Sequence, residues 1–592
     1  MKKEKIALFT FPLIWCFWFW CMPGHIVFGE ESDFFMLKSA YWQEFALRPG
    51  GWTDYLAHFL LQFYKWPAVG ALLLTGINFG LYMAIRFIAV HLSVPPAWLW
   101  VGYIPVFLNL YLQLHSDIFL GESLRMFFFF WGLGGYVAIR SVKWRYGIFT
   151  FAFPLLYLTL SPGGCIFLFL TCWGYELWRM KEKGRWGIGI LWLGLLWSFP
   201  YIWRREMFFS SSESLYALIL TPLKNAGMWA VWGMYVYGLC LLLIACGAGK
   251  MQKPFRRWVY WSELALVFVG LGLCFYRMYP AEREVFYRLD QAVQQGKWER
   301  ALLVAQGIKE PTREEMYLIC LALACNDQIG DRLFDFPVWG LGCLYLPRDM
   351  DYQTNVIGGE FYYRLNIPNE GIHWIFQASV GTPQGMDFRC LRRLVDLNIQ
   401  KRDFAVAEKY LSVLEHSSNH RQWCAGKRVE LEAVARDTLN FFADRDFFIG
   451  GRPFLSDMAR VLDAGKSKSL TLNYVLCGLL LNKELEKFCR IFTHFYSYGP
   501  DVRLPRAYEQ ALLVAMDFQH ESVMEKNWGV SVESARAYSD YMTIFQRYQG
   551  NKEEAKKMLW RFKNTYWYYL HFVSPRIADV KGHELPGVRY ST

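Results

Sequence analysis

Residues 29–67 read GEESDFFMLKSAYWQEFALRPGGWTDYLAHFLLQFYKWP, and the rest of the chain can be organised around this stretch. It follows an apolar run from Ile6 to about Phe28 that lacks a small-residue cleavage site, which predicts a retained first membrane span. Charged side chains are dense among its aromatic residues: Glu30, Glu31, Asp33, Glu44, Arg48 and Asp54. The stretch is therefore predicted to be an outward-facing loop of a membrane enzyme, with a solvated connector as the alternative.

Two short helices are predicted in this loop. Residues 33–47 have helical composition, and Pro49-Gly50-Gly51 ends that helix. From Trp52 to Tyr64, apolar residues recur at i, i+3, i+4 and i+7, as on one face of an amphipathic helix. The opposite face carries Asp54, His58 and Gln62. Such a helix is expected to lie on the membrane surface with its aromatic side toward lipid.

The whole chain reads as an all-α protein with two domains. Of its 592 residues, 54% are hydrophobic and 19% aromatic, which is high for a soluble protein. Residues 1–279 contain apolar blocks of roughly twenty residues, the length of a membrane span, whereas charged residues recur every few positions in 280–592. This predicts a polytopic transmembrane bundle of about nine spans before a soluble domain. After the first span, the others are expected at about 67–90, 97–114, 124–140, 147–161, 164–179, 186–203, 227–248 and 257–277.

Charge placement predicts the topology. With a cytoplasmic N-terminus, the inner segments carry fifteen lysines and arginines and the outer ones seven, as the positive-inside rule requires. An odd number of spans then puts the C-terminal domain on the outer face. The acids sort the opposite way, and Glu30, Asp54, Asp117 and Glu122 all lie outside. Because acids have little influence on topology, their concentration suggests a site for acid–base or metal chemistry.

Several partner and cofactor classes are disfavoured. The net charge of +11 comes largely from basic residues at span ends, so the lipid bilayer is an expected partner and nucleic acid is not. The fourteen cysteines form no CxxC motif and no zinc-ligand spacing. Neither a metal centre nor a disulfide scaffold is therefore expected from the cysteines.

The C-terminal domain repeats a local theme three times. A turn residue precedes an alanine by five positions at Gly296 and Ala301, at Arg402 and Ala407, and at Gly550 and Ala555. This pattern resembles the tetratricopeptide repeat and implies an extracytoplasmic α-solenoid of helical hairpins. Residues 336–385, rich in Gly, Pro and aromatic residues, are expected to form an irregular insertion.

The order of these features resembles the GT-C class of membrane glycosyltransferases. The shared features are an N-terminal span, a large first outer loop with acids directly after it, and two short helices in that loop. The resemblance implies an enzyme that takes a sugar from a polyprenyl-phosphate donor and uses a first-loop carboxylate. The repeat domain would then present a protein or glycan acceptor. The clear Asp-Glu pair and following tyrosine of that class are not found here.

The resemblance implies specific site residues. Glu30, Glu31 and Asp33 are the candidate catalytic acids. The candidate substrate- and phosphate-binding residues are Arg48, Asp117, Glu122, Arg125, Arg204 and Arg205. A carboxylate here can act as a general base. Several carboxylates together can instead hold a divalent cation against the donor phosphate, which leaves the cofactor open.

Each candidate also has a structural interpretation. The three catalytic candidates can instead interact with a helix dipole, and Asp117 and Glu122 can cap a helix. Arg204 and Arg205 can anchor a span at the head groups. Glu176, near the inner face, is expected to pair with Arg179, and His58 is expected to be an interface residue.

Most of the chain is similar to an uncharacterised bacterial family of multi-pass proteins with the same N-terminal loop and C-terminal helical domain. This similarity implies a bacterial inner membrane protein with a periplasmic C-terminal domain. Three functions follow as hypotheses. The first is a GT-C-type glycosyltransferase, the second is a non-enzymatic scaffold for envelope proteins, and the third is a lipid or glycan transporter. The third is disfavoured because no internal duplication is evident.

Overall fold

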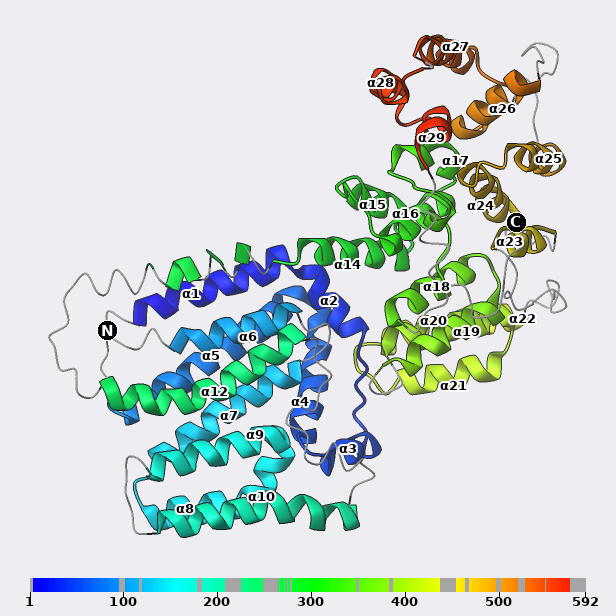
Figure 1. Cartoon of the computed structure of the whole chain (residues 1–592). Helices are drawn as coiled ribbons and strands as arrows, with labels where there is room; N and C mark the ends of the chain where they lie inside the picture. Colours follow the sequence, from blue (N-terminus) through cyan, green and yellow to red (C-terminus); the bar gives the residue numbers. More distant parts are fainter. Residues whose placement is uncertain are drawn as a thin grey trace. The chain divides into compact units, whose positions relative to one another are not determined.

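The computed structural model shows an all-helical protein (Figure 1). The described residues are 4–94, 102–115, 120–177, 184–207, 225–248, nine residues between 265 and 276, 279–347, 351–382, 387–436, 454–463, 468–496, 502–519, 528–548 and 550–574. These residues contain no strand, which confirms the predicted class. The chain forms two compact units. Unit 1 comprises Met1–Glu284 and His416–Arg421, and unit 2 comprises Val285–Glu415 and Gln422–Thr592.

Unit 1 begins with a sharply bent pair of helices. The first part is α1 (Glu4–Cys16), continued by a π-helical turn (Phe17–Cys21), and the second is α2 (Pro23–Glu31). The segments Phe9–Cys21 and Pro23–Glu31 meet at 73°. Two backbone amides at the start of α2, those of Gly24 and His25, donate to the Glu284 carboxylate at 2.8 and 2.9 Å. The carboxylate therefore satisfies amides that a helix start leaves without partners.

The remaining long helices of unit 1 run alongside one another in Figure 1. Their apolar side chains form two clusters of buried residues. The helices are α5 (Pro67–His91), α6 (Tyr103–His115), α7 (Leu120–Ala138), α8 (Val142–Phe151), α9 (Phe153–Tyr175), α10 (Arg185–Met207) and α12 (Asn225–Ala248).

Fewer helices qualify as membrane spans than the sequence predicted. Among the described residues, two are long and apolar enough, Pro67–His91 and Phe153–Tyr175, or three if the bent pair at the N-terminus counts as one. Nine were expected. Part of the difference arises because predicted spans correspond to shorter helices, since α6 has 13 residues and α8 has 10. The predicted span at 257–277 lies largely outside the described residues.

The break predicted between residues 161 and 164 lies inside α9. Ser161 has φ 77° and ψ 164°, so two helical segments meet there at a kink. The chain reverses around it, because Arg145 Nε lies 2.6 Å from Glu176 Oε1. A straight helix would separate residues 31 positions apart by roughly 46 Å. Glu176 therefore pairs with Arg145, while its expected partner Arg179 lies outside the described residues.

The first loop contains the two predicted helices, although the first is shorter than expected. They are α3 (Ser39–Ala46) and α4 (Gly51–Leu61), followed by a 3₁₀ turn (Gln62–Lys65). The turn between them needs glycine at Gly50, whose φ is +68°. The predicted Gly-Gly break is thus confirmed.

The burial of α4 differs from the prediction. Its polar residue His58 is buried and faces protein, not solvent. The aromatic side chains of Tyr55 and Phe59 pack on a small cluster that includes Phe35, although they were expected to face lipid. Amphipathic spacing distinguishes two faces of a helix but does not say which one meets the protein.

Unit 2 is a series of helical hairpins built on one large cluster of buried apolar residues and a smaller one. The helices are α14 (Ala281–Gln294), α15 (Trp298–Ala305), α16 (Arg313–Cys325), α17 (Ile329–Arg332), α18 (Tyr352–Arg364), α19 (Pro368–Val380), α20 (Phe388–Lys401), α21 (Phe404–Leu414), α22 (Arg421–Arg436), α23 (Phe454–Asp463), α24 (Lys468–Leu481), α25 (Leu485–Phe495), α26 (Arg506–Gln519), α27 (Val532–Arg547), α28 (Lys552–Met558) and α29 (Tyr566–Phe572).

The turns of the first four hairpins recur at similar spacing. Each contains a residue with positive φ, and these residues lie 31, 39 and 36 positions apart: Gly296, Asp327, Asn366 and Arg402. The alanines predicted to allow close helix packing, Ala301, Ala407 and Ala555, are all buried. The sequence predicted the turns at Gly296 and Arg402. It missed those at Asp327 and Asn366, because no alanine follows either residue by five positions.

The predicted irregular insertion at 336–385 is wrong for most of its length, because α18 and α19 lie there. Gly358 and Gly359 of this stretch serve helix packing instead of a turn. A Cβ on Gly358 or Gly359 would lie 2.2–2.3 Å from the side chains of Trp374 or Ile375. Glycine is therefore required so that the two helices can approach closely.

Candidate functional site

Glu30 is the buried acid of the first loop. It is the penultimate residue of α2, and only 7% of its surface is exposed. Its Oε1 accepts a hydrogen bond from Asn419 Nδ2 at 3.2 Å and lies 3.4 Å from His420 Nε2. Both partners belong to the segment His416–Arg421, which is part of unit 1. The carboxyl group is thus enclosed by residues far apart in the sequence.

This environment suits proton transfer at neutral pH. Burial raises the pKa of Glu30 to about 7, and the negative charges of Glu31 and Asp33 act in the same direction. The hydrogen bond from Asn419 and the charge of Lys65 lower the pKa and limit the rise. A carboxyl group that is half protonated near pH 7 can both accept and return a proton.

Asp33 forms an ion pair with the histidine of α4. Its Oδ1 lies 2.6 Å from His58 Nδ1, and both side chains are nearly buried, at 13% and 11% exposure. Burial opposes protonation of His58, but the charge and hydrogen bond of Asp33, together with the charge of Asp54, raise its pKa above the usual value. The pair therefore holds α4 against the chain that follows α2.

Arg125 of α7 is bound between two carboxylates. Its Nη1 donates to Glu122 Oε1 and its Nη2 to Asp54 Oδ1, both at 2.5 Å. The arginine is 1% exposed. Gly121 permits this approach, because a Cβ there would lie 2.9 Å from Asp54 Oδ1. A donor phosphate would have to displace one of these carboxylates, so the predicted phosphate contact is not supported at Arg125.

The other predicted site residues are placed as follows. Glu31 is half-buried at the end of α2. Arg48 is exposed, with its guanidinium 5.8 Å from the centre of the Phe45 ring. Arg204 and Arg205 lie in α10, but their side chains are outside the described part, as is all of Asp117. Arg48 is therefore the one predicted phosphate ligand whose side chain is described and open to solvent.

The structure joins several candidates into one polar cluster. Asp33, Glu122 and Arg125 are connected through His58 and Asp54, whose charges interact. Within the described ranges, no group of three His, Cys, Asp or Glu side chains is arranged to hold a metal ion. The carboxylates of Glu30, Asp33, Asp54 and Glu122 each lie beside a histidine or an arginine.

Comparison with known families covers almost the whole chain. A family model described as "Family of unknown function (DUF6057)" matches residues 2–573. The chain belongs to DUF6057. This agrees with the predicted membership in a family without an established function, and the match includes both units. No curated protein and no solved structure matches this DUF6057 chain.

Sequence reasoning did not identify four residues of this polar region as site residues, namely Asp54, His58, Asn419 and His420. Asp54 and His58 were assigned to one face of α4, but that face was expected to be solvated. The i, i+4 spacing of an acid and a histidine was the available signal. Asn419 and His420 gave no local signal, because nearly 390 positions separate them from Glu30.

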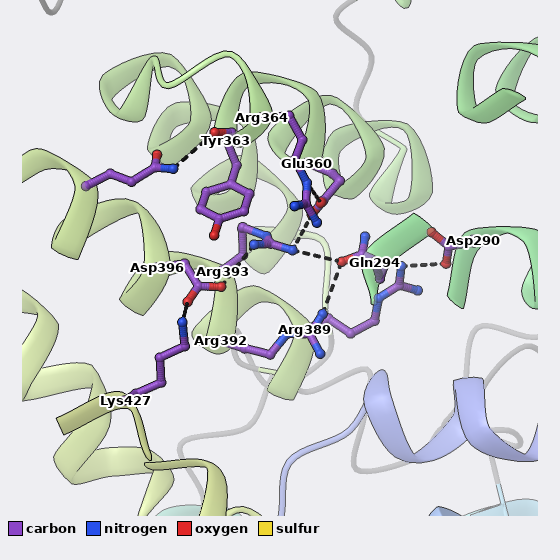
Figure 2. Close-up of polar contacts among 11 residues, drawn as sticks. Asp290, Gln294, Glu360, Tyr363, Arg364, Arg389, Arg392, Arg393, Asp396 and Lys427 are labelled. Carbon is purple, nitrogen blue, oxygen red and sulfur yellow. Dashed lines mark hydrogen bonds and ion pairs between the residues drawn. The ribbon is translucent and has the colours of Figure 1, made fainter. Parts of the chain in front are cut away.

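A second polar cluster lies in unit 2 (Figure 2). Its centre is Arg393 of α20, which contacts Glu360 and donates to Asp396 at 2.9 Å. The guanidinium lies 4.0 Å from the centre of the Tyr363 ring. Asp396 in turn pairs with Lys427 at 2.7 Å.

The edge of this cluster is paired as well. Arg389 donates to Asp290 at 2.5 Å, and Arg364 donates to Glu360 at 2.7 Å (Figure 2). Gln294 accepts from Arg392 and Arg393 at 3.3 and 3.4 Å. These contacts join α14, α18, α20 and α22, so the cluster acts as an internal framework of unit 2. Breaking one buried pair of this kind typically costs about 3–5 kcal/mol.

Proposed function

We propose that this DUF6057 protein is a membrane glycosyltransferase of the GT-C type, with Glu30 as its general base. The proposed reaction transfers a sugar from a polyprenyl-phosphate donor to an acceptor hydroxyl on the outer face of the membrane. The observation that carries the proposal is the buried carboxyl of Glu30, whose pKa of about 7 suits proton transfer. A well-placed base contributes roughly 10²–10⁴-fold to a rate.

The position of Glu30 supports this role. It stands at the C-terminal end of the first apolar helix pair, close to where the GT-C layout has its catalytic carboxylate. Asp33 has a different task in this proposal, since it pairs with His58 and holds the loop together. Arg48 is the exposed cation of the loop and is the proposed contact for the donor phosphate.

The membrane topology is part of the same proposal. We infer a cytoplasmic N-terminus and a periplasmic C-terminal domain in a bacterial inner membrane. The hairpins of unit 2 are proposed to form a tetratricopeptide-like solenoid that presents the acceptor. An alkaline phosphatase fused after Thr592 should be active in cells, and an inactive but stable fusion would contradict this topology.

Complementation of a deletion strain tests the function. The strain should carry Glu30→Gln or Glu44→Gln, and the envelope glycans should be compared with those of the wild type. Glu44 is a matched control, because it belongs to the same loop but is exposed. We expect Glu30→Gln to be produced at normal level without restoring the glycans, and Glu44→Gln to restore them. Full complementation by Glu30→Gln would contradict the proposed base.

A further inference from the structure

The segment His416–Arg421 is held against the first loop by contacts with Glu30 and with the turn Gln62–Lys65. Asn419 Nδ2 donates to the backbone oxygen of Gln62 at 2.6 Å as well as to Glu30, and Lys65 Nζ donates to Asn419 O at 2.9 Å. Ser418 Oγ donates to Gln62 Oε1 at 3.2 Å. The side chain and the backbone of Asn419 are therefore both fixed by the turn that follows α4.

His420 is the titratable group closest to Glu30 in this segment. Its Nε2 lies 3.4 Å from Glu30 Oε1, and both side chains are about 7% exposed. The other charged groups that act on Glu30 are Glu31, Asp33 and Lys65. An imidazole can take up a proton near neutral pH, so His420 can receive one from the Glu30 carboxyl group. The distance is close enough for a proton to move between the two groups after a small adjustment.

We propose that Asn419 and His420 complete the first-loop site as positioning residues for Glu30. Asn419 orients the carboxylate, and His420 receives the proton that Glu30 removes. This proposal rests on the proposed function. It goes beyond the first-loop acids, because it assigns part of the site to a segment that follows Glu415 in the chain.

The proposed step balances as follows. The acceptor hydroxyl loses its proton to Glu30 while its oxygen forms a bond to the sugar carbon that leaves the donor phosphate. The bond between that carbon and the phosphate oxygen breaks, and polyprenyl phosphate departs with both electrons. Glu30 then passes the proton to His420 Nε2, and the imidazolium releases it to water.

A titration of His420 tests the pair without any enzymatic assay. Full-length protein labelled with ¹³C-histidine, in lipid nanodiscs, would be titrated by NMR as the wild type and as Glu30→Gln. The variant His420→Gln assigns the signal among the eleven histidines. We expect the midpoint of His420 to fall by roughly one pH unit in Glu30→Gln, because the neighbouring anion is lost. An unchanged midpoint would overturn the pair.

The pH profile separates positioning from packing. Asn419→Asp places a second carboxylate beside Glu30, which raises the pKa of Glu30 and should shift the acid limb of sugar transfer to higher pH. The control Ser418→Ala alters the same segment without touching Glu30, and its profile should match the wild type. If Asn419→Asp lowered sugar transfer by the same factor at every pH, Asn419 would have only a structural role, and the proposal would be overturned.

The two proposals fail in different ways. If Glu30→Gln shifts the titration of His420 but still transfers sugar, the proposed base is wrong, and the role of His420 in catalysis falls with it. If Glu30→Gln is inactive and the titration of His420 is unchanged, the base stands and the positioning residues are wrong.

Discussion

Glu30 illustrates how a single buried carboxyl acquires a pH dependence. Because burial raises its pKa to about 7 from 4.5, folding takes up a proton between these values. The contribution of Glu30 to the stability of the folded state is therefore highest below pH 4.5 and is lost as the pH rises through about 7.

Glu30→Gln should remove this loss. At pH 8 we expect Glu30→Gln to unfold at a higher temperature than the wild type. If the full pKa shift of Glu30 applies, the free energy of unfolding of the variant should be greater by on the order of 3 kcal/mol. The difference should narrow as the pH falls toward 5. Unfolding of both proteins in the same detergent, followed by circular dichroism, measures it. A difference that does not change with pH would contradict the burial of an ionisable Glu30.

The pair of Asp33 and His58 should likewise lose its stabilising effect as the pH rises. The pKa of His58 is raised in the folded state, so its stabilising effect is complete below pH 6.5 and is lost as the pH rises through the folded value. Asp33→Asn should cost about 1–3 kcal/mol at pH 6 and less at pH 8, since a neutral His58 can still donate to an amide oxygen. Thermal unfolding at the two pH values measures this, and an equal cost at both would contradict the ion pair.

At the residue scale, the sequence could predict candidates but not partners. Glu30 and Asp33 could be named as candidates because they follow the first predicted span within a few residues of sequence. The role of His58 was misjudged, because its partner Asp33 lies across a turn. Asn419 and His420 could not be found at all, since their contacts depend on how distant segments fold back.

The elements of unit 1 are joined by Arg125. This side chain links α4 to α7 through Asp54 and neutralises Glu122 of its own helix. Arg125→Ala would remove this cation from the buried Glu122 and the partly exposed Asp54. We expect a loss of about 3–5 kcal/mol.

Arg48→Ala is the control for this loss, because Arg48 is exposed and should change stability by no more than about 0.5 kcal/mol. Chemical denaturation of both variants in detergent compares them. Similar stabilities would show that Arg125 does not carry the link between α4 and α7.

The hairpins of unit 2 depend on small residues. Ala407 is fully buried on α21, whereas Ala405 on the same helix is exposed. Ala407→Leu should destabilise unit 2 by about 1–3 kcal/mol, because the larger side chain forces α20 and α21 apart. Ala405→Leu controls for the change in composition. Thermal unfolding compares the two, and equal stability would contradict close packing at Ala407.

Glycines show why element boundaries were harder to predict than element types. The same residue type makes the turn at Gly50, where φ is positive, and the helix contact at Gly358. Composition alone does not separate these two uses, so α18 and α19 were taken for an insertion. The turn at Arg402 was found only because the alanine five positions later indicated a hairpin.

At the scale of the whole molecule, the sequence predicted an all-helical chain whose N-terminal part is apolar. The fold agrees with the all-helical prediction. The number of spans depends on where each helix ends. Hydropathy is averaged over a window of residues, so it does not resolve these ends. The helices α6 and α8 are shorter than a bilayer needs when taken singly, and Ser161 divides α9. The match to DUF6057 extends across both units.

Transfer of sugar by the purified protein tests the central claim most directly. Wild type, Glu30→Gln and Glu44→Gln would be reconstituted into liposomes with ¹⁴C-labelled polyprenyl-phosphate sugars and an envelope fraction from the deletion strain. We predict that label moves from the lipid to the envelope fraction with the wild type and Glu44→Gln, and that Glu30→Gln reduces this at least 100-fold, in line with loss of a general base worth roughly 10²–10⁴. Equal transfer by Glu30→Gln, or no transfer by the wild type above empty liposomes, would contradict the account.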